Sequence, residues 1–198
     1  SEDDETGLGG RVWIGCMMNH VVYVLNGDTG LVEDSAPVQV GPYGGAMDGR
    51  GSFWTVAMTC TVMMCRLSRL DMTSMTDTVY SVPCGYGISV DAAGNVWTAG
   101  AGCVNKLDPV SGTNTTYSTG MTSFNRGIAV DGSGSVWAAV TSGEVMRVNQ
   151  SDVTLVHRFP VHTSGSHGDV VGVAIDFQGF VWAVAYNDGA TGYAIKID

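Results

Sequence analysis

The chain has 198 residues, of which 44% are hydrophobic and only 14% charged, and its formal net charge is −10 at pH 7. This composition is typical of a folded domain rather than a disordered chain. With only Lys106 and Lys196 as lysines, the sequence offers no basic stripe for nucleic-acid phosphates or an anionic membrane surface. No apolar run approaches the roughly 18–20 residues of a membrane-spanning helix, so membrane insertion is not expected.

The first residues differ from the rest of the chain. Residues 1–10 include Glu2, Asp3, Asp4 and Glu5 and show no alternation of apolar and polar residues. We interpret residues 1–10 as an acidic linker and residues 11–198 as one repeat domain.

Five tryptophans mark a repeat along that domain, spaced by 41, 43, 40 and 45 residues. A glycine lies three residues before each tryptophan, and an aspartate lies six residues before each of the last four. The five are Trp13, Trp54, Trp97, Trp137 and Trp182. A period of about 40–50 residues with one tryptophan per unit predicts an all-β fold, a β-propeller with one blade per unit.

The third unit shows how one blade is built. Short apolar or alternating runs at 87–90, 95–99, 104–107 and 115–117 predict four antiparallel strands. Between the first two runs, Asp91 opens a four-residue turn whose backbone N–H groups its side chain can accept. We expect the small inner strand to lie near the propeller axis and the tryptophan of the second strand to fill the gap between blades. A ligand-stacking role for all five tryptophans is the less favoured alternative.

The first and last units are incomplete. In the first, strands are predicted at 11–14 and 21–25, but the acidic linker occupies the place of the innermost strand. The last unit reaches its third strand at 193–198. Either the ring closes imperfectly or the repeats are part of a larger propeller, and we favour the larger propeller.

The repeated run Gly-Ile-x-Val-Asp-x-x-Gly-x-Val-Trp, at 87–97 and 127–137, resembles propellers of the streptogramin-lyase-like and NHL-repeat-like group. The resemblance implies the fold. Lyases of this group commonly carry an acidic residue soon after the repeat tryptophan and act with a divalent metal and a histidine base. Here the third residue after each tryptophan is Cys16, Ala57, Gly100, Val140 or Ala185. None is acidic, so no catalytic residue is transferred by the motif.

One candidate binding site lies where the inner strands begin. The residue before each first-strand glycine should point toward the central channel, and these residues are Tyr43, Tyr86, Arg126 and Val171. Two tyrosines and the planar donor fork of an arginine could hold a carbohydrate-like or anionic ligand, or a protein partner. The alternative is that these side chains only plug the channel.

A second candidate is the polar stretch from Arg158 to Asp169, predicted to connect the fourth and fifth units. It contains His162 and His167, which with Asp169 could bind a divalent cation (Ca²⁺ or Mg²⁺) or act as acid and base. A loop with incidental histidines is the alternative. Asp28 and Asp188 are interpreted as ordinary turn residues, since one short turn cannot supply the oxygens that calcium needs.

The five cysteines match no zinc-binding spacing. Cys60 could pair with Cys65 across a hairpin and Cys84 with Cys103, leaving Cys16 over, although this is one of fifteen two-bridge pairings. That pairing would place the protein in an oxidising compartment, extracellular or periplasmic. The alternative is that all five are reduced and buried.

Together these observations predict an exported, non-enzymatic β-propeller that presents a loop-built face to a partner or ligand. One alternative is a metal-dependent lyase or lactonase of the streptogramin-lyase-like group, using His162, His167 and Asp169. A second is a subunit of an extracellular assembly that associates with itself or with further blades.

Overall fold

The computed structural model describes residues 10–58, 60, 64–120, 124–161, 168–186 and 192–197, apart from the side chain of Tyr186. This part of the chain contains strands and turns and no helix, and therefore no helix able to cross a membrane. Its eighteen strands form five antiparallel sheets of three, four, four, four and three strands. The strands of the first two sheets are β1 (Arg11–Cys16), β2 (Val21–Asn26), β3 (Val32–Pro37), β4 (Gly44–Met47), β5 (Ser52–Val56), β6 (Cys65–Asp71) and β7 (Asp77–Val82). The strands of the other three are β8 (Gly87–Val90), β9 (Val96–Gly100), β10 (Cys103–Asp108), β11 (Thr113–Ser118), β12 (Asn125–Val130), β13 (Ser135–Val140), β14 (Glu144–Asn149), β15 (Leu155–Pro160), β16 (Asp169–Ile175), β17 (Val181–Tyr186) and β18 (Gly192–Ile197).

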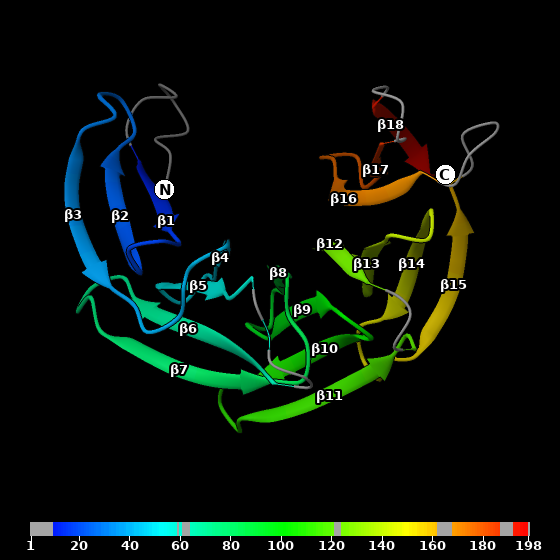
Figure 1. The fold of residues 1–198 in the computed structure, drawn as a ribbon, viewed down its shortest axis with the longest axis horizontal. Helices are drawn as coiled ribbons and strands as arrows, with labels where there is room; N and C mark the ends of the chain where they lie inside the picture. Colours follow the sequence, from blue (N-terminus) through cyan, green and yellow to red (C-terminus); the bar gives the residue numbers. More distant parts are fainter. Residues whose placement is uncertain are drawn as a thin grey trace.

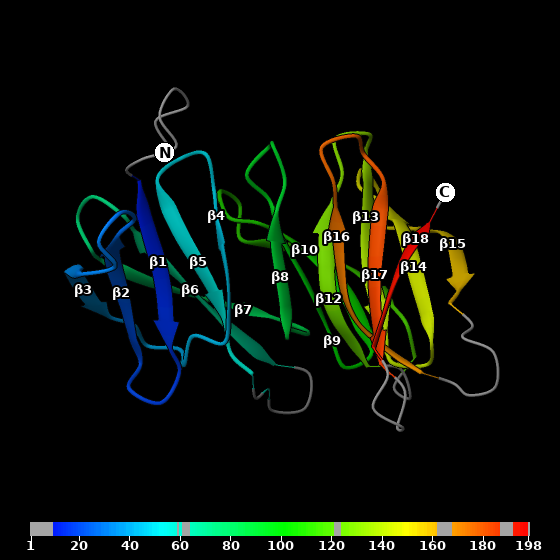
Figure 2. The same ribbon diagram turned by 90° about the horizontal axis from the view of Figure 1, so that it is seen from above.

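The five sheets stand side by side around an arc, as blades of a propeller do (Figure 1). Strands β4, β8, β12 and β16 line the inside of the arc, and β3, β7, β11 and β15 lie at its outer edge. Among the described residues the first sheet has no inner strand and the last no outer strand, which agrees with the two incomplete blades predicted from the sequence. The ring is open between these two sheets (Figures 1 and 2).

An aspartate at each inner hairpin joins the turn to the tryptophan. In the third sheet, Oδ1 of Asp91 accepts the backbone N–H of Asn95 at 2.8 Å, and its Oδ2 accepts the indole Nε1–H of Trp97 at 3.0 Å. Gly94 ends this turn with φ +83°, a conformation that only glycine adopts without strain. The same aspartate–tryptophan bond recurs at 2.8–2.9 Å in Asp48–Trp54, Asp131–Trp137 and Asp176–Trp182.

A cation on the third strand of a sheet lies over the tryptophan. Arg69 is 5.5 Å from the Trp54 ring centroid, Lys106 is 5.5 Å from that of Trp97, and Arg147 is 5.3 Å from that of Trp137. Each cation is the cross-strand register partner of its tryptophan. The sequence pattern does not reveal this contact, because the loop between the second and third strands varies in length and the cations follow no fixed spacing from the tryptophans.

The tryptophans pack against the following sheet. Trp54 and Trp97 are fully buried and Trp137 is only 7% exposed, each among apolar residues of the next sheet. Trp13 stacks on Phe53 of the second sheet at 5.9 Å between centroids. Trp182 is an exception to the expected packing between blades: it is 38% exposed, because no described sheet follows its own.

Hydrogen bonds keep the pKa of the four turn aspartates below the usual value. For Asp48, Asp91 and Asp131, burial is the largest single effect and raises the pKa, but the hydrogen bonds from indole and turn N–H groups together outweigh it. For Asp176, the hydrogen bond from Trp182 is the largest effect and lowers the pKa directly.

Replacing Asp91 with alanine should lower the free energy of unfolding by about 2–3 kcal/mol, because the indole N–H of the fully buried Trp97 would lose its acceptor. Urea unfolding followed by tryptophan fluorescence measures this. Asp108→Ala, at an exposed turn of the same sheet, is the control and should cost clearly less. Equal losses in the two variants would contradict a special role for the aspartate–tryptophan bond.

Thermal stability should fall as the pH drops below roughly 4, the usual range for an aspartate. The folded-state pKa values of these aspartates are lowered, so their contribution is complete above the unfolded-state pKa and is lost as the pH falls through the folded-state values. Calorimetry between pH 2.5 and 7 tests this. A flat melting temperature across that range would be the contrary result.

Candidate functional site

The inner strands all begin at the same end of the molecule. The antiparallel register sets Gly44 opposite Val56 and Gly87 opposite Ala99, so the start of each inner strand lies beside the end of the second strand. This end is the lower edge of Figure 2, where β1 turns into β2. Tyr43, Tyr86 and Arg126, which directly precede or begin these inner strands, therefore lie at the same end of the molecule.

Five side chains form a continuous row there, which we call the rim cluster: Tyr43, Tyr86, Phe124, Arg126 and Asp169. The hydroxyl groups of Tyr43 and Tyr86 are hydrogen-bonded at 2.5 Å, and their ring centroids are 4.8 Å apart. Tyr86 also packs edge-on against Phe124, at 5.2 Å between centroids. These contacts connect the starts of three successive inner strands through aromatic rings.

Arg126 continues the row into the last sheet. Its Nη2 is 3.8 Å from Oδ2 of Asp169, and both side chains are about one-third exposed. The Nε of Arg126 is buried and has no hydrogen-bond partner among the described residues. The pairing of β12 with β13 shifts between Asn125 and Ile128, and such a bulge reorients the side chain of the extra residue.

The backbone around Arg126 is held from the neighbouring sheets. The amide of Asn125 is fully buried and donates to the carbonyl oxygens of Gly100 and Cys103 at 2.8 and 3.2 Å. A Cβ atom on Gly87 would collide with the carbonyl oxygen of Arg126, so only glycine permits this approach of β8 to β12. The roles of Asn125 and Phe124 at this site were not predicted from the sequence, because neither residue belongs to a repeated motif.

Two disulfides lie on either side of the segment that carries Tyr86. Cys60 is bonded to Cys65 and Cys84 to Cys103, the pairing considered from the sequence, and Cys16 is free. The carbonyl oxygen of Cys84 also accepts the Thr98 hydroxyl at 2.7 Å. The backbone before Tyr86 is therefore fixed by covalent and hydrogen bonds.

Interactions within the rim cluster raise the pKa of Tyr43 and so favour its neutral form. The hydrogen bond with Tyr86 is the main cause that raises the pKa of Tyr43, with partial burial adding to it and the charge of Arg126 opposing it. The Tyr43 hydroxyl therefore stays protonated at neutral pH and can donate and accept hydrogen bonds. The cluster thus offers two hydroxyls, a guanidinium and a carboxylate beside aromatic faces.

The polar stretch from Arg158 to Asp169 is not entirely the connecting loop that the sequence had suggested. Arg158 lies within β15 and Asp169 begins β16, so both belong to strands rather than to the connecting loop. Arg158 is paired with Glu144 at 2.9 Å, and Asp169 approaches Arg126. His162, His167 and Asp188 lie outside the described residues. Within the described part of the chain, no group of three or more His, Cys, Asp or Glu side chains could hold a metal ion.

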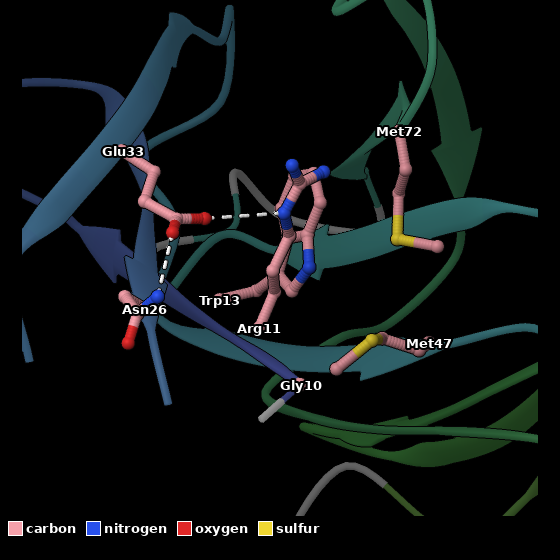
Figure 3. A pocket seen from close by; sticks show the side chains of 7 residues that line it. All are labelled: Gly10, Arg11, Trp13, Asn26, Glu33, Met47 and Met72. Atoms are coloured by element: carbon pink, nitrogen blue, oxygen red, sulfur yellow. Dashed lines mark hydrogen bonds and ion pairs between the residues drawn. The ribbon is translucent and has the colours of Figure 1, made fainter. Parts of the chain in front are cut away.

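A cavity lies at the opposite end, between the first two sheets (Figure 3). It has a volume of about 550 Å³ and is lined by Gly10, Arg11, Trp13, Asn26, Glu33, Met47 and Met72. The cross-strand partner of Trp13 is Val24, whereas the other sheets have an arginine or lysine opposite the tryptophan. No long cationic side chain from this position therefore fills the cavity. Arg11 and Asn26 both donate to Glu33, at 3.2 and 2.8 Å, so the polar wall is internally satisfied. We therefore place the candidate site at the rim cluster and not in this groove.

Comparison with solved structures gives the fold. Hydrazine synthase of Kuenenia stuttgartiensis is similar, with a TM-score of 0.76 at 13% identity over 95% of this chain and 60% of that one. Two structures of the extracellular domain of one B. thetaiotaomicron protein, named for a one-component and for a hybrid two-component system, have TM-scores of 0.64 and 0.65. They are 14% and 15% identical to this chain over 96% of its length and 27% of theirs.

The blades are propeller-like. This chain spans 60% of the hydrazine synthase chain and 27% of the B. thetaiotaomicron chains, and at such low identity the likeness shows the fold alone. No protein-family model and no curated protein matches the sequence. The streptogramin-lyase-like or NHL-repeat-like grouping therefore stays a prediction. The two disulfides indicate a location outside the cytoplasm.

Tyr86→Phe should lower the pKa of Tyr43 toward its ordinary value, because the hydrogen bond that stabilises the protonated Tyr43 would be lost. NMR titration of ¹³Cζ-labelled tyrosine measures this, with Tyr43→Phe to assign the resonance. Tyr23→Phe in the first sheet is the matched control and should leave the titration unchanged. An unaltered Tyr43 pKa in Tyr86→Phe would contradict the hydrogen bond.

Proposed function

We propose that the protein is a non-enzymatic, extracellular or periplasmic binding module whose rim cluster recognises a carbohydrate-like ligand. The observation that carries this proposal is the row of Tyr43, Tyr86 and Phe124 beside the Arg126–Asp169 pair. Aromatic faces can stack on the apolar face of a sugar ring. Hydroxyl, guanidinium and carboxylate groups can exchange hydrogen bonds with its hydroxyls.

The charge distribution favours a neutral ligand. The chain carries a net charge of −10, which repels polyanions over long range. Arg126, a cation of the rim cluster, lies within 3.8 Å of the carboxylate of Asp169, so the pair presents a donor beside an acceptor rather than an isolated positive charge. A polyhydroxyl compound uses both kinds of group.

The rigidity of the site supports binding as well. Tyr86 follows directly on a segment fixed by Cys84–Cys103, and the neighbouring Gly85 is so closely packed that a Cβ would lie 2.6 Å from Val56. Aromatic side chains on a fixed backbone lose little entropy on binding, which is how preorganised sites gain affinity.

Calorimetric titration with a panel of neutral and acidic oligosaccharides tests the proposal. We expect binding by a neutral member, weakened about tenfold or more by Tyr86→Ala and by Arg126→Ala, a loss of roughly 1.4 kcal/mol or more each. Arg50→Ala removes the same charge at the opposite end, where Arg50 donates to the carbonyl of Ala93, and should bind normally.

Other outcomes would replace this proposal. Binding that survives both rim variants would place the ligand elsewhere. A protein partner captured through the rim cluster, with no saccharide bound, would change the ligand class. Metal-dependent turnover abolished by a His162→Ala, His167→Ala double variant would instead favour the lyase or lactonase alternative.

A further inference from the structure

One contact between neighbouring sheets recurs at every junction. The tryptophan of one sheet packs on the residue before the next tryptophan and on the cross-strand partner of that residue. The receiving pairs are Phe53/Leu70, Val96/Leu107, Val136/Val148 and Val181/Ile197. They lie in the same apolar clusters as Trp13, Trp54, Trp97 and Trp137 respectively. The four junctions thus repeat one interface.

Each end of the arc carries one half of this interface without the other. On the last sheet, Trp182 is 38% exposed and Val184, two residues after it, is 48% exposed. In the three preceding sheets the residue two after the tryptophan, such as Val56, is fully buried. On the first sheet, Val12 directly precedes Trp13 and has Leu25 as its cross-strand partner, so these two residues are equivalent to the receiving pairs. Val12 is 48% exposed. Figure 1 shows the two sheets at opposite sides of the opening, so within one molecule these halves do not meet.

We propose that these two faces are the halves of a head-to-tail interface between copies of this chain. The Trp182 face of one copy packs on the Val12–Leu25 face of a second copy, as each tryptophan packs on the following sheet within the molecule. The commitment to a second copy rests on continuity with the internal interface, since this chain itself carries both complementary halves. The contact is heterologous, so each copy keeps one further face for another partner.

The charges at the ends agree with this contact. Lys196 is the cross-strand partner of Trp182, just as Lys106 is the cross-strand partner of Trp97. Lys106 donates across its junction to the carbonyl of Gln150, in the turn after the third strand of the next sheet. The corresponding turn of the first sheet, after Asn26, contains the acidic Asp28. A cation on one face would therefore meet an acidic turn on the other.

Sedimentation velocity over a wide concentration range tests the proposal with three matched substitutions. We call the Val12–Leu25 face the head face and the Trp182 face, which includes Val184, the tail face. Val12→Lys places a charge on the head face and Val184→Lys places one on the tail face. Val110→Lys adds the same charge at a turn residue that is 84% exposed. Wild type and Val110→Lys should associate as concentration rises. Either face variant should associate at least about tenfold more weakly.

Mixing the two face variants gives a positive result that misfolded protein cannot produce. Val12→Lys keeps an intact tail face and Val184→Lys an intact head face, so an equimolar mixture should form a 1:1 dimer and stop there. The proposal is overturned if wild type stays monomeric at every concentration, or if the face variants associate as wild type does. It is also overturned if the faces are covered only when a different polypeptide is added.

Discussion

The hydrogen bond from a tryptophan indole to the aspartate six residues before it stabilises both the inner hairpins and the packing between sheets. The carboxylate holds the inner hairpin by accepting turn N–H groups and fixes the indole with its second oxygen. An indole held in this way presents its face to the next sheet, while an arginine or lysine covers it from the third strand. One carboxylate thereby couples a local turn to the packing between sheets.

The same coupling explains where the two ends differ from the middle. The first sheet has Val24 in place of the cation, and a groove opens beside Trp13. The last sheet has the complete aspartate–tryptophan bond, but none of the described sheets follows it, and its indole is partly exposed. Propeller sheets are stabilised by their neighbours, so the end faces carry apolar surface that an interior sheet would bury.

The rim cluster depends on different forces. Its side chains come from successive inner strands, and the crowding of glycine backbone near the axis brings those strands together. Two disulfides and the buried amide of Asn125 then fix the backbone from which Tyr86 and Arg126 project. A face built in this way can vary its side chains without disturbing the hairpins at the opposite end, as expected for a fold that serves many functions.

The architecture could be predicted from the repeat, because a fixed period of glycine, aspartate and tryptophan reports local turn chemistry and one recurrent packing contact. The sequence also placed Tyr43, Tyr86 and Arg126 at equivalent positions and gave a cysteine pairing that agrees with the structure. Only the tertiary structure paired Arg126 with Asp169, placed Phe124 against Tyr86 and revealed the cations over the tryptophans. Those contacts join residues whose separation varies with loop length, and a one-dimensional pattern cannot encode a distance across sheets.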